Sequence, residues 1–157
     1  MLGENILQAL TLALLVLLVA AGIEDARTRE IANWKNAAIA LLAPVWWWAN
    51  DLSIWPGMAI QLAIGLGVFA LFACAFFAGQ MGGGDVKMLG ALALWLPLQP
   101  LAWMLIWMSL LGGALTIAML VDKKVRKSAA RVEIPYGVAI AMAALLLFRE
   151  PIFNPLG

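Results

Sequence analysis

The chain has 157 residues, of which 65% are hydrophobic and 12% are charged, and its formal net charge is +1. Soluble domains contain about 45–50% apolar and about 25% charged residues, so this composition excludes an ordinary soluble protein and indicates an integral membrane protein. No basic run is long enough to follow a phosphate backbone, and histidine is absent. Nucleic-acid binding and the common zinc and Ser-His-Asp chemistries are therefore excluded, and we expect neither a metal nor a cofactor.

Six apolar segments predict an all-α, polytopic membrane protein with about six transmembrane helices. In chain order they cover residues 5–23, 34–50, 57–78, 86–97, 100–121 and 135–149. A helix needs about 20 residues to cross a bilayer, so helices four and six are predicted to be short. The first segment has no basic residue before it, unlike a signal peptide, and we interpret it as a retained span.

The basic residues predict the orientation of these spans. Nine of the ten lie in the loops after the first, third and fifth segments: Arg27, Arg29, Lys35, Lys87, Lys123, Lys124, Arg126, Lys127 and Arg131. By the positive-inside rule, these loops are cytoplasmic and both termini lie outside.

Tryptophans occur where the chain should reach the outer interface. Four flank the second outside loop and two flank the turn near residue 98: Trp46, Trp47, Trp48, Trp55, Trp95 and Trp103. Such residues form aromatic belts in membrane proteins. On the fifth segment, Ser109 and Gly113 form a small-xxx-small pair that predicts a helix contact.

Asp85 is the most informative acidic residue, because it follows three glycines and precedes the short fourth segment. Twelve residues of helix cover only about 18 Å of a hydrocarbon core of about 30 Å. We therefore expect Asp85 to lie some 10 Å below the cytoplasmic surface, and an acid at such depth points to function. In the alternative interpretation, Asp85 caps the helix and the glycines form an ordinary loop.

Asp25 is predicted to reach the same boundary, because it follows Asn5 by 20 residues, about 30 Å of helix. Glu24 is an equally good candidate by position, and Asp25 could also be a juxtamembrane charge paired with Arg27 or Arg29. Two carboxylates in one site can hydrolyse a peptide without a metal. One is ionised and accepts a proton from water, while the other is protonated and donates to the carbonyl oxygen.

At these residues the chain resembles the type IV prepilin peptidases, which are GxGD-type membrane aspartic peptidases. The resemblance rests on Asp25-Ala26-Arg27 followed by Ile31-Ala32-Asn33, on Gly82-Gly83-Gly84-Asp85-Val86-Lys87, and on Pro135-Tyr136-Gly137. It implies that Asp25 and Asp85 are the catalytic pair. It also implies that eight further residues support the site: Gly82, Gly83, Gly84, Lys87, Asn33, Pro135, Tyr136 and Gly137. Ala32 replaces the proline of the usual Ile-Pro-Asn motif, so the turn after Asp25 is expected to be less fixed.

The resemblance also implies the biological setting. Residues 1–157 would form a single membrane-embedded prepilin-peptidase-like domain in a bacterial, or else an archaeal, cytoplasmic membrane. Its substrate would be a prepilin or pseudopilin whose short basic leader is removed at the cytoplasmic face. The chain has one cysteine and no cysteine-rich methylating domain, and so it is similar to the short form associated with Flp (Tad) pili.

Two other interpretations stay open at the level of sequence. The aspartates could relay protons or cations in a small membrane transporter, as the short fourth and sixth segments would allow. The chain could also be a non-catalytic membrane protein of pilus assembly. Among peptidases, an archaeal preflagellin peptidase would differ in substrate rather than in mechanism. The sequence carries no signal for an oligomeric state.

Overall fold

A computed structural model describes residues 2–126 and 134–149, which form six α-helices and one short π-helical segment, with no strand among them. The elements are α1 (Leu2–Thr28), α2 (Asn33–Ala49), η1 (Ile54–Met58), α3 (Ala59–Phe77), α4 (Gly83–Ala93), α5 (Leu98–Arg126) and α6 (Tyr136–Arg149). Three stretches are long and apolar enough to cross a membrane: Gly3–Thr28, Ile54–Phe77 and Leu98–Val125. The prediction of an all-α membrane protein is confirmed, and α4 and α6 are short, with 11 and 14 residues.

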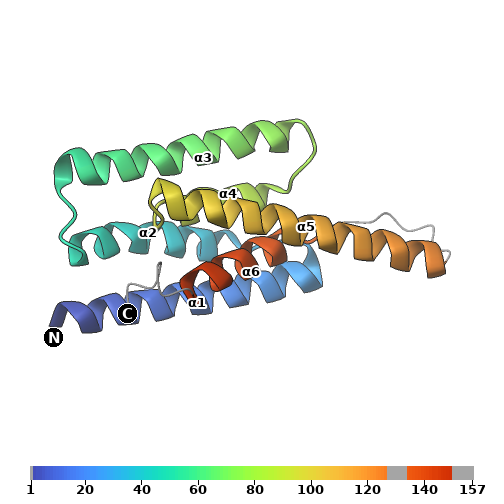
Figure 1. Cartoon of the computed structure of the whole chain (residues 1–157), viewed down its shortest axis with the longest axis horizontal. Coiled ribbons are helices and arrows are strands. Elements are labelled where there is room, and N and C mark those ends of the chain that lie inside the picture. The colour runs from blue at the N-terminus through green and yellow to red at the C-terminus, as the bar shows by residue number, and fades with distance from the viewer. Residues whose placement is uncertain (1, 127–133, 150–157) are drawn as a thin grey trace.

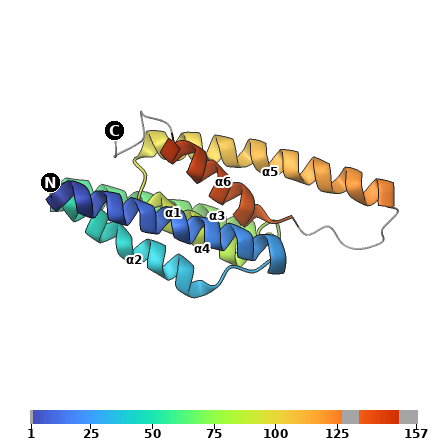
Figure 2. The same ribbon diagram turned by 90° about the horizontal axis from the view of Figure 1, so that it is seen from below.

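The helices form one bundle in which alternate connections lie toward the same end. α1, α3 and α5 end, and α2, α4 and α6 begin, toward the right of Figure 1. α6 lies between α1 and α5 and packs against both (Figure 2). α4 packs against α2, α3 and α6, so the shortest helix has neighbours on several sides. The segments that carry the three sequence motifs therefore meet at one end of the bundle.

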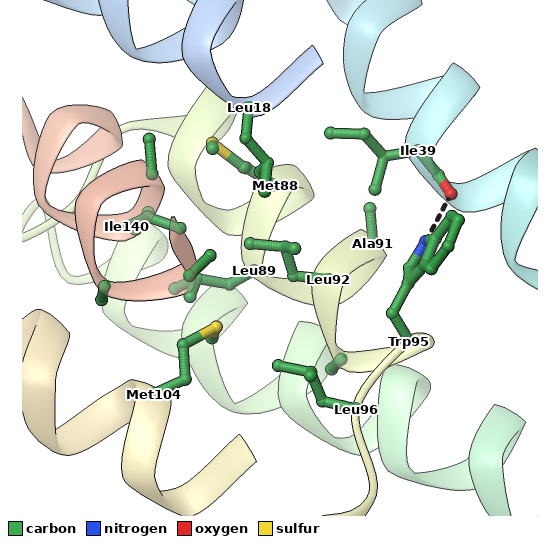
Figure 3. Packing of buried hydrophobic residues seen from close by; sticks show 14 of the residues in the cluster. Leu18, Ile39, Met88, Leu89, Ala91, Leu92, Trp95, Leu96, Met104 and Ile140 are labelled. Atoms are coloured by element: carbon green, nitrogen blue, oxygen red, sulfur yellow. Dashed lines mark hydrogen bonds between the residues drawn. The ribbon is translucent and has the colours of Figure 1, made fainter. Parts of the chain in front are cut away.

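α4 is the central element because it is apolar nearly all round, a pattern that favours burial on every face. Eight of its eleven residues are buried, among them Met88, Leu89 and Leu92, which lie in the cluster of Figure 3. Glycines let α3 approach closely. A Cβ on Gly90 would lie 2.9 Å from the Cβ of Phe69, and one on Gly65 would overlap Leu94.

Two of the tryptophans assigned to an interfacial belt belong instead to the interior, so that part of the prediction is wrong. Trp47 and Trp95 are buried, and Trp48 and Trp55 are exposed. The indole Nε1 of Trp47 donates to the carbonyl of Leu94 at 2.7 Å, at the end of α4, where helix carbonyls lack helical partners. The Nε1 of Trp95 donates to the carbonyl of Ile39 at 2.9 Å (Figure 3). Both indoles tie α2 to α4.

The predicted contact through Ser109 and Gly113 is also wrong, by one residue. A Cβ on Gly113 would have nothing within 4 Å, and the Ser109 hydroxyl donates back to the carbonyl of Leu105 at 2.8 Å. The face of α5 that packs against α6 instead contains Gly112, whose added Cβ would lie 3.5 Å from the ring of Tyr136. The spacing indicated a small-residue surface but did not fix which face meets the neighbouring helix.

Candidate active site

Asp25 lies near the end of α1 and is 4% exposed. Its Oδ2 accepts a hydrogen bond from the backbone N–H of Val138 at 3.2 Å, and a Cβ on Gly137 would lie 2.8 Å from the same oxygen. The carboxylate therefore sits at the first turn of α6, where unpaired amides and the helix dipole stabilise negative charge. Pro135 is buried and precedes α6, so the helix begins one residue later than predicted, at Tyr136.

Asp85 is the third residue of α4 and is 7% exposed. The expectation that it lies before this helix is wrong, because the N-cap position belongs to Gly82 and both Gly83 and Gly84 are helical. Asp85 is consequently not the cap. Its carboxylate folds back toward Gly82, where an added Cβ would lie 3.0 Å from Oδ2. An acid in the first turn of a helix is electrostatically favoured.

The two aspartates face the same space although they come from different motifs. Both line a hollow of about 280 Å³ and an adjoining one of about 340 Å³. An added Cβ on Gly137 would contact the Asp25 carboxylate, and one on Gly82 would contact the Asp85 carboxylate. Arg29 and Gly82 also line both hollows. Of the two arginines that follow Asp25, Arg29 lines the site and Arg27 does not.

Ile31 connects the motifs, a role that sequence analysis did not assign to it. The residue is 7% exposed and lines the smaller hollow. A Cβ on Gly84 would lie 3.2 Å from its Cβ, and a Cβ on Gly137 would lie 2.7 Å from its Cδ1. Ile31 thus fills the space left by two glycines that flank the aspartates. The available signal was a large apolar side chain directly after the charged residues Arg29 and Glu30.

Some of the predicted supporting residues line a hollow and others do not. Gly82, Gly83, Gly84 and Asn33 line the smaller hollow, and Tyr136 lines the larger one. Lys87 reaches neither: its Nζ donates to Asn33 Oδ1 at 2.8 Å, which links α4 to the start of α2.

Asn36 is a second residue that sequence analysis missed. It is buried on α2, and its Nδ2 donates to the carbonyl of Gly84 at 3.1 Å. The signal was an amide side chain one turn into a largely apolar helix, which in a membrane protein usually has a hydrogen-bonding partner.

The chemistry that this arrangement permits follows from charge. Two buried carboxylates that line the same space can share one proton, because a second negative charge there would be poorly solvated. The first turns of α4 and α6 converge on the pair and stabilise its single negative charge. Such a pair can act as an acid and a base at once.

Comparison with known proteins places the chain in a family. No curated protein and no solved structure was found to match the chain. The model of the type IV leader peptidase family matches residues 12–117, more than half of the chain, and this range includes both aspartates. The chain therefore belongs to the type IV leader peptidase family.

Proposed function

We propose that this protein is an aspartic endopeptidase that removes the leader peptide from type IV (Flp-like) prepilins or pseudopilins, with Asp25 and Asp85 as the catalytic pair. Family membership supports a leader-peptidase function. One structural observation carries the assignment of residues: the two buried carboxylates, from separate motifs, line the same two hollows.

The proposed reaction needs only this pair and a water molecule. The ionised carboxylate takes a proton from water as the water oxygen attacks the scissile carbonyl carbon, and the protonated carboxylic acid donates its proton to the carbonyl oxygen. When the resulting tetrahedral diol collapses, one of its hydroxyl groups gives a proton to the ionised carboxylate, the C–N bond breaks, and the leaving nitrogen receives the proton of the protonated carboxylic acid. The products are a free carboxyl group and a free amine, and one proton is again shared between the aspartates.

The position of the site suits a substrate at a membrane boundary. The hollows lie where α1 ends and where α4 and α6 begin, the end of the bundle that also carries Arg29, Lys35 and Lys87. By the positive-inside rule this end faces the cytoplasm. A precursor whose apolar segment stays in the bilayer would present its leader there. The two hollows that the pair lines leave space beside the aspartates for a peptide chain.

The decisive experiment is a cleavage assay with a candidate prepilin and the variants Asp25→Asn and Asp85→Asn. Asparagine keeps the size of aspartate but cannot ionise, so each variant should lose cleavage while its membrane level stays normal. Asp51→Asn is the matched control, because Asp51 is exposed in the turn after α2. Cleavage surviving either site substitution would remove that residue from the catalytic pair.

We further propose that the protein cleaves without methylating the new N-terminus, because the chain resembles the short form of the family. Mass spectrometry of a pilin processed by the purified protein should show an unmodified N-terminal amine, even with a methyl donor present. A methylated product made by this chain alone would contradict the proposal.

A further inference from the structure

The turn between α1 and α2 is anchored by a carboxylate that the proposed mechanism does not use. Glu24 precedes Asp25 on α1, and its Oε2 accepts a hydrogen bond from the backbone N–H of Ala32 at 2.9 Å. The same oxygen accepts from Lys35 Nζ at 2.7 Å. One carboxylate oxygen thus binds the turn at Ala32 and the first turn of α2 at Lys35.

This anchor lies next to the residue that connects the catalytic motifs. Ala32 directly follows Ile31, whose side chain packs against Gly84 and Gly137. Gly84 adjoins Asp85 in α4, and the Gly137 backbone touches the carboxylate of Asp25. A shift of the turn would therefore move Ile31 and loosen the packing on both sides of the pair.

The backbone at Ala32 shows why an anchor is needed at this point. Ala32 has φ −59° and ψ 130°, values that a proline would adopt by itself. Alanine does not fix φ, but it has the N–H that proline lacks, and here that N–H binds Glu24. A charge-assisted hydrogen bond therefore restrains the backbone at Ala32, the position that a proline ring would restrain covalently.

We propose that Glu24 is a positioning residue for the catalytic pair, an inference that rests on the proposed function. Through the Ala32 N–H and Lys35, it holds the turn that seats Ile31 between the two glycines. The sequence expectation of a loosely fixed turn is thereby corrected: the turn is fixed, but by a carboxylate. An isolated exposed ion pair would contribute little, whereas here two donors meet one oxygen and one donor belongs to the backbone of the turn.

The test is a cycle of Glu24→Ala, Ala32→Pro and the double variant in the cleavage assay. Glu24→Ala should lower kcat roughly 10- to 100-fold with KM changed by less than about threefold, because reacting groups are misplaced while substrate contacts remain. Ala32→Pro alone should keep nearly normal activity, because the ring supplies the observed φ. In the double variant, proline should restore kcat to within about threefold of the parent.

Rescue is the outcome that distinguishes positioning from a general loss of stability, since two destabilising changes would add. Failure of proline to rescue Glu24→Ala, or a parental kcat for Glu24→Ala itself, would overturn the proposal. If Glu24→Ala fails to accumulate, Glu24→Gln takes its place in the cycle, because glutamine keeps the size and loses the charge. Asp51→Asn again controls for removal of a carboxylate.

A readout that does not depend on cleavage separates this inference from the proposed function. Amide hydrogen exchange over residues 29–33 should speed up in Glu24→Ala and stay slow in Asp25→Asn. Unchanged exchange in Glu24→Ala would refute the anchor. Normal cleavage by Asp25→Asn would refute the proposed function while the exchange result still stood.

Discussion

Replacing Gly137 by alanine is the smallest change that should disturb the aspartate pair without removing a functional group. A Cβ at this position would lie 2.8 Å from Asp25 Oδ2, 2.9 Å from Asp25 Cγ and 2.7 Å from Ile31 Cδ1. Two of these atoms belong to the Asp25 carboxylate and one to the side chain of Ile31. Neither neighbour can give way freely, because both are more than nine-tenths buried.

The size of the effect follows from the displacement required. Ordinary contact begins at 3.4 Å, so the 2.8 Å approach to Oδ2 falls 0.6 Å short and the carboxylate has to move by about that distance. A misplacement of about 1 Å at a reacting group can cost roughly 100-fold, so we expect Gly137→Ala to lower kcat roughly 10- to 30-fold. The overpacking should also reduce stability by about 1–3 kcal/mol.

The assay is a time course of prepilin cleavage with purified protein, with kcat and KM measured separately. Gly113→Ala is the matched control, because an added Cβ there has nothing within 4 Å and alanine favours a helix. It should cleave like the parent. A Gly137→Ala variant that is well folded in detergent and has the parental kcat would refute the claim that Gly137 sets the position of Asp25.

Three further predictions concern the packing around the site. Trp47→Phe should lower stability in detergent by about 1 kcal/mol, because the indole bond to α4 is lost, whereas Trp48→Phe, at an exposed position, should have no effect on the melting temperature. Gln61→Leu should lower stability in detergent by about 0.5–2 kcal/mol, because the Gln61 Nε2 donates to two carbonyls, at the end of α4 and just after it, at 2.8 and 2.7 Å. An unchanged melting temperature would show that these bonds contribute nothing. Asn36→Leu should lower kcat severalfold, because the hydrogen bond to the carbonyl of Gly84 is lost. It should change stability little, because the Asn36 Oδ1 is buried without a partner in the described residues, which offsets the gain from that bond; a large loss of stability would contradict this.

Local sequence was sufficient for the elements but not for their contacts. Apolar runs broken by charged turns predicted the helices and the shortness of α4 and α6, because the length of an apolar run limits the length of a buried helix. Local sequence did not separate interfacial from interior tryptophans, since Trp47 and Trp48 are adjacent residues of the same type, yet one is buried and the other is exposed. The face of a uniformly apolar helix that meets another helix depends on shape, and hydropathy carries no information about shape.

Composition and the order of residues along the chain were enough to predict an all-α membrane protein with acidic residues near the end of its first helix and near the start of its fourth. Three contacts required the folded structure: Asp25 meets the first turn of α6, Ile31 fills the gap left by Gly84 and Gly137, and Glu24 anchors the turn between α1 and α2. In each of these contacts, the two joined segments are held in place by different neighbouring helices. Their geometry is therefore set by the packing of the whole bundle around α4 rather than by any local segment.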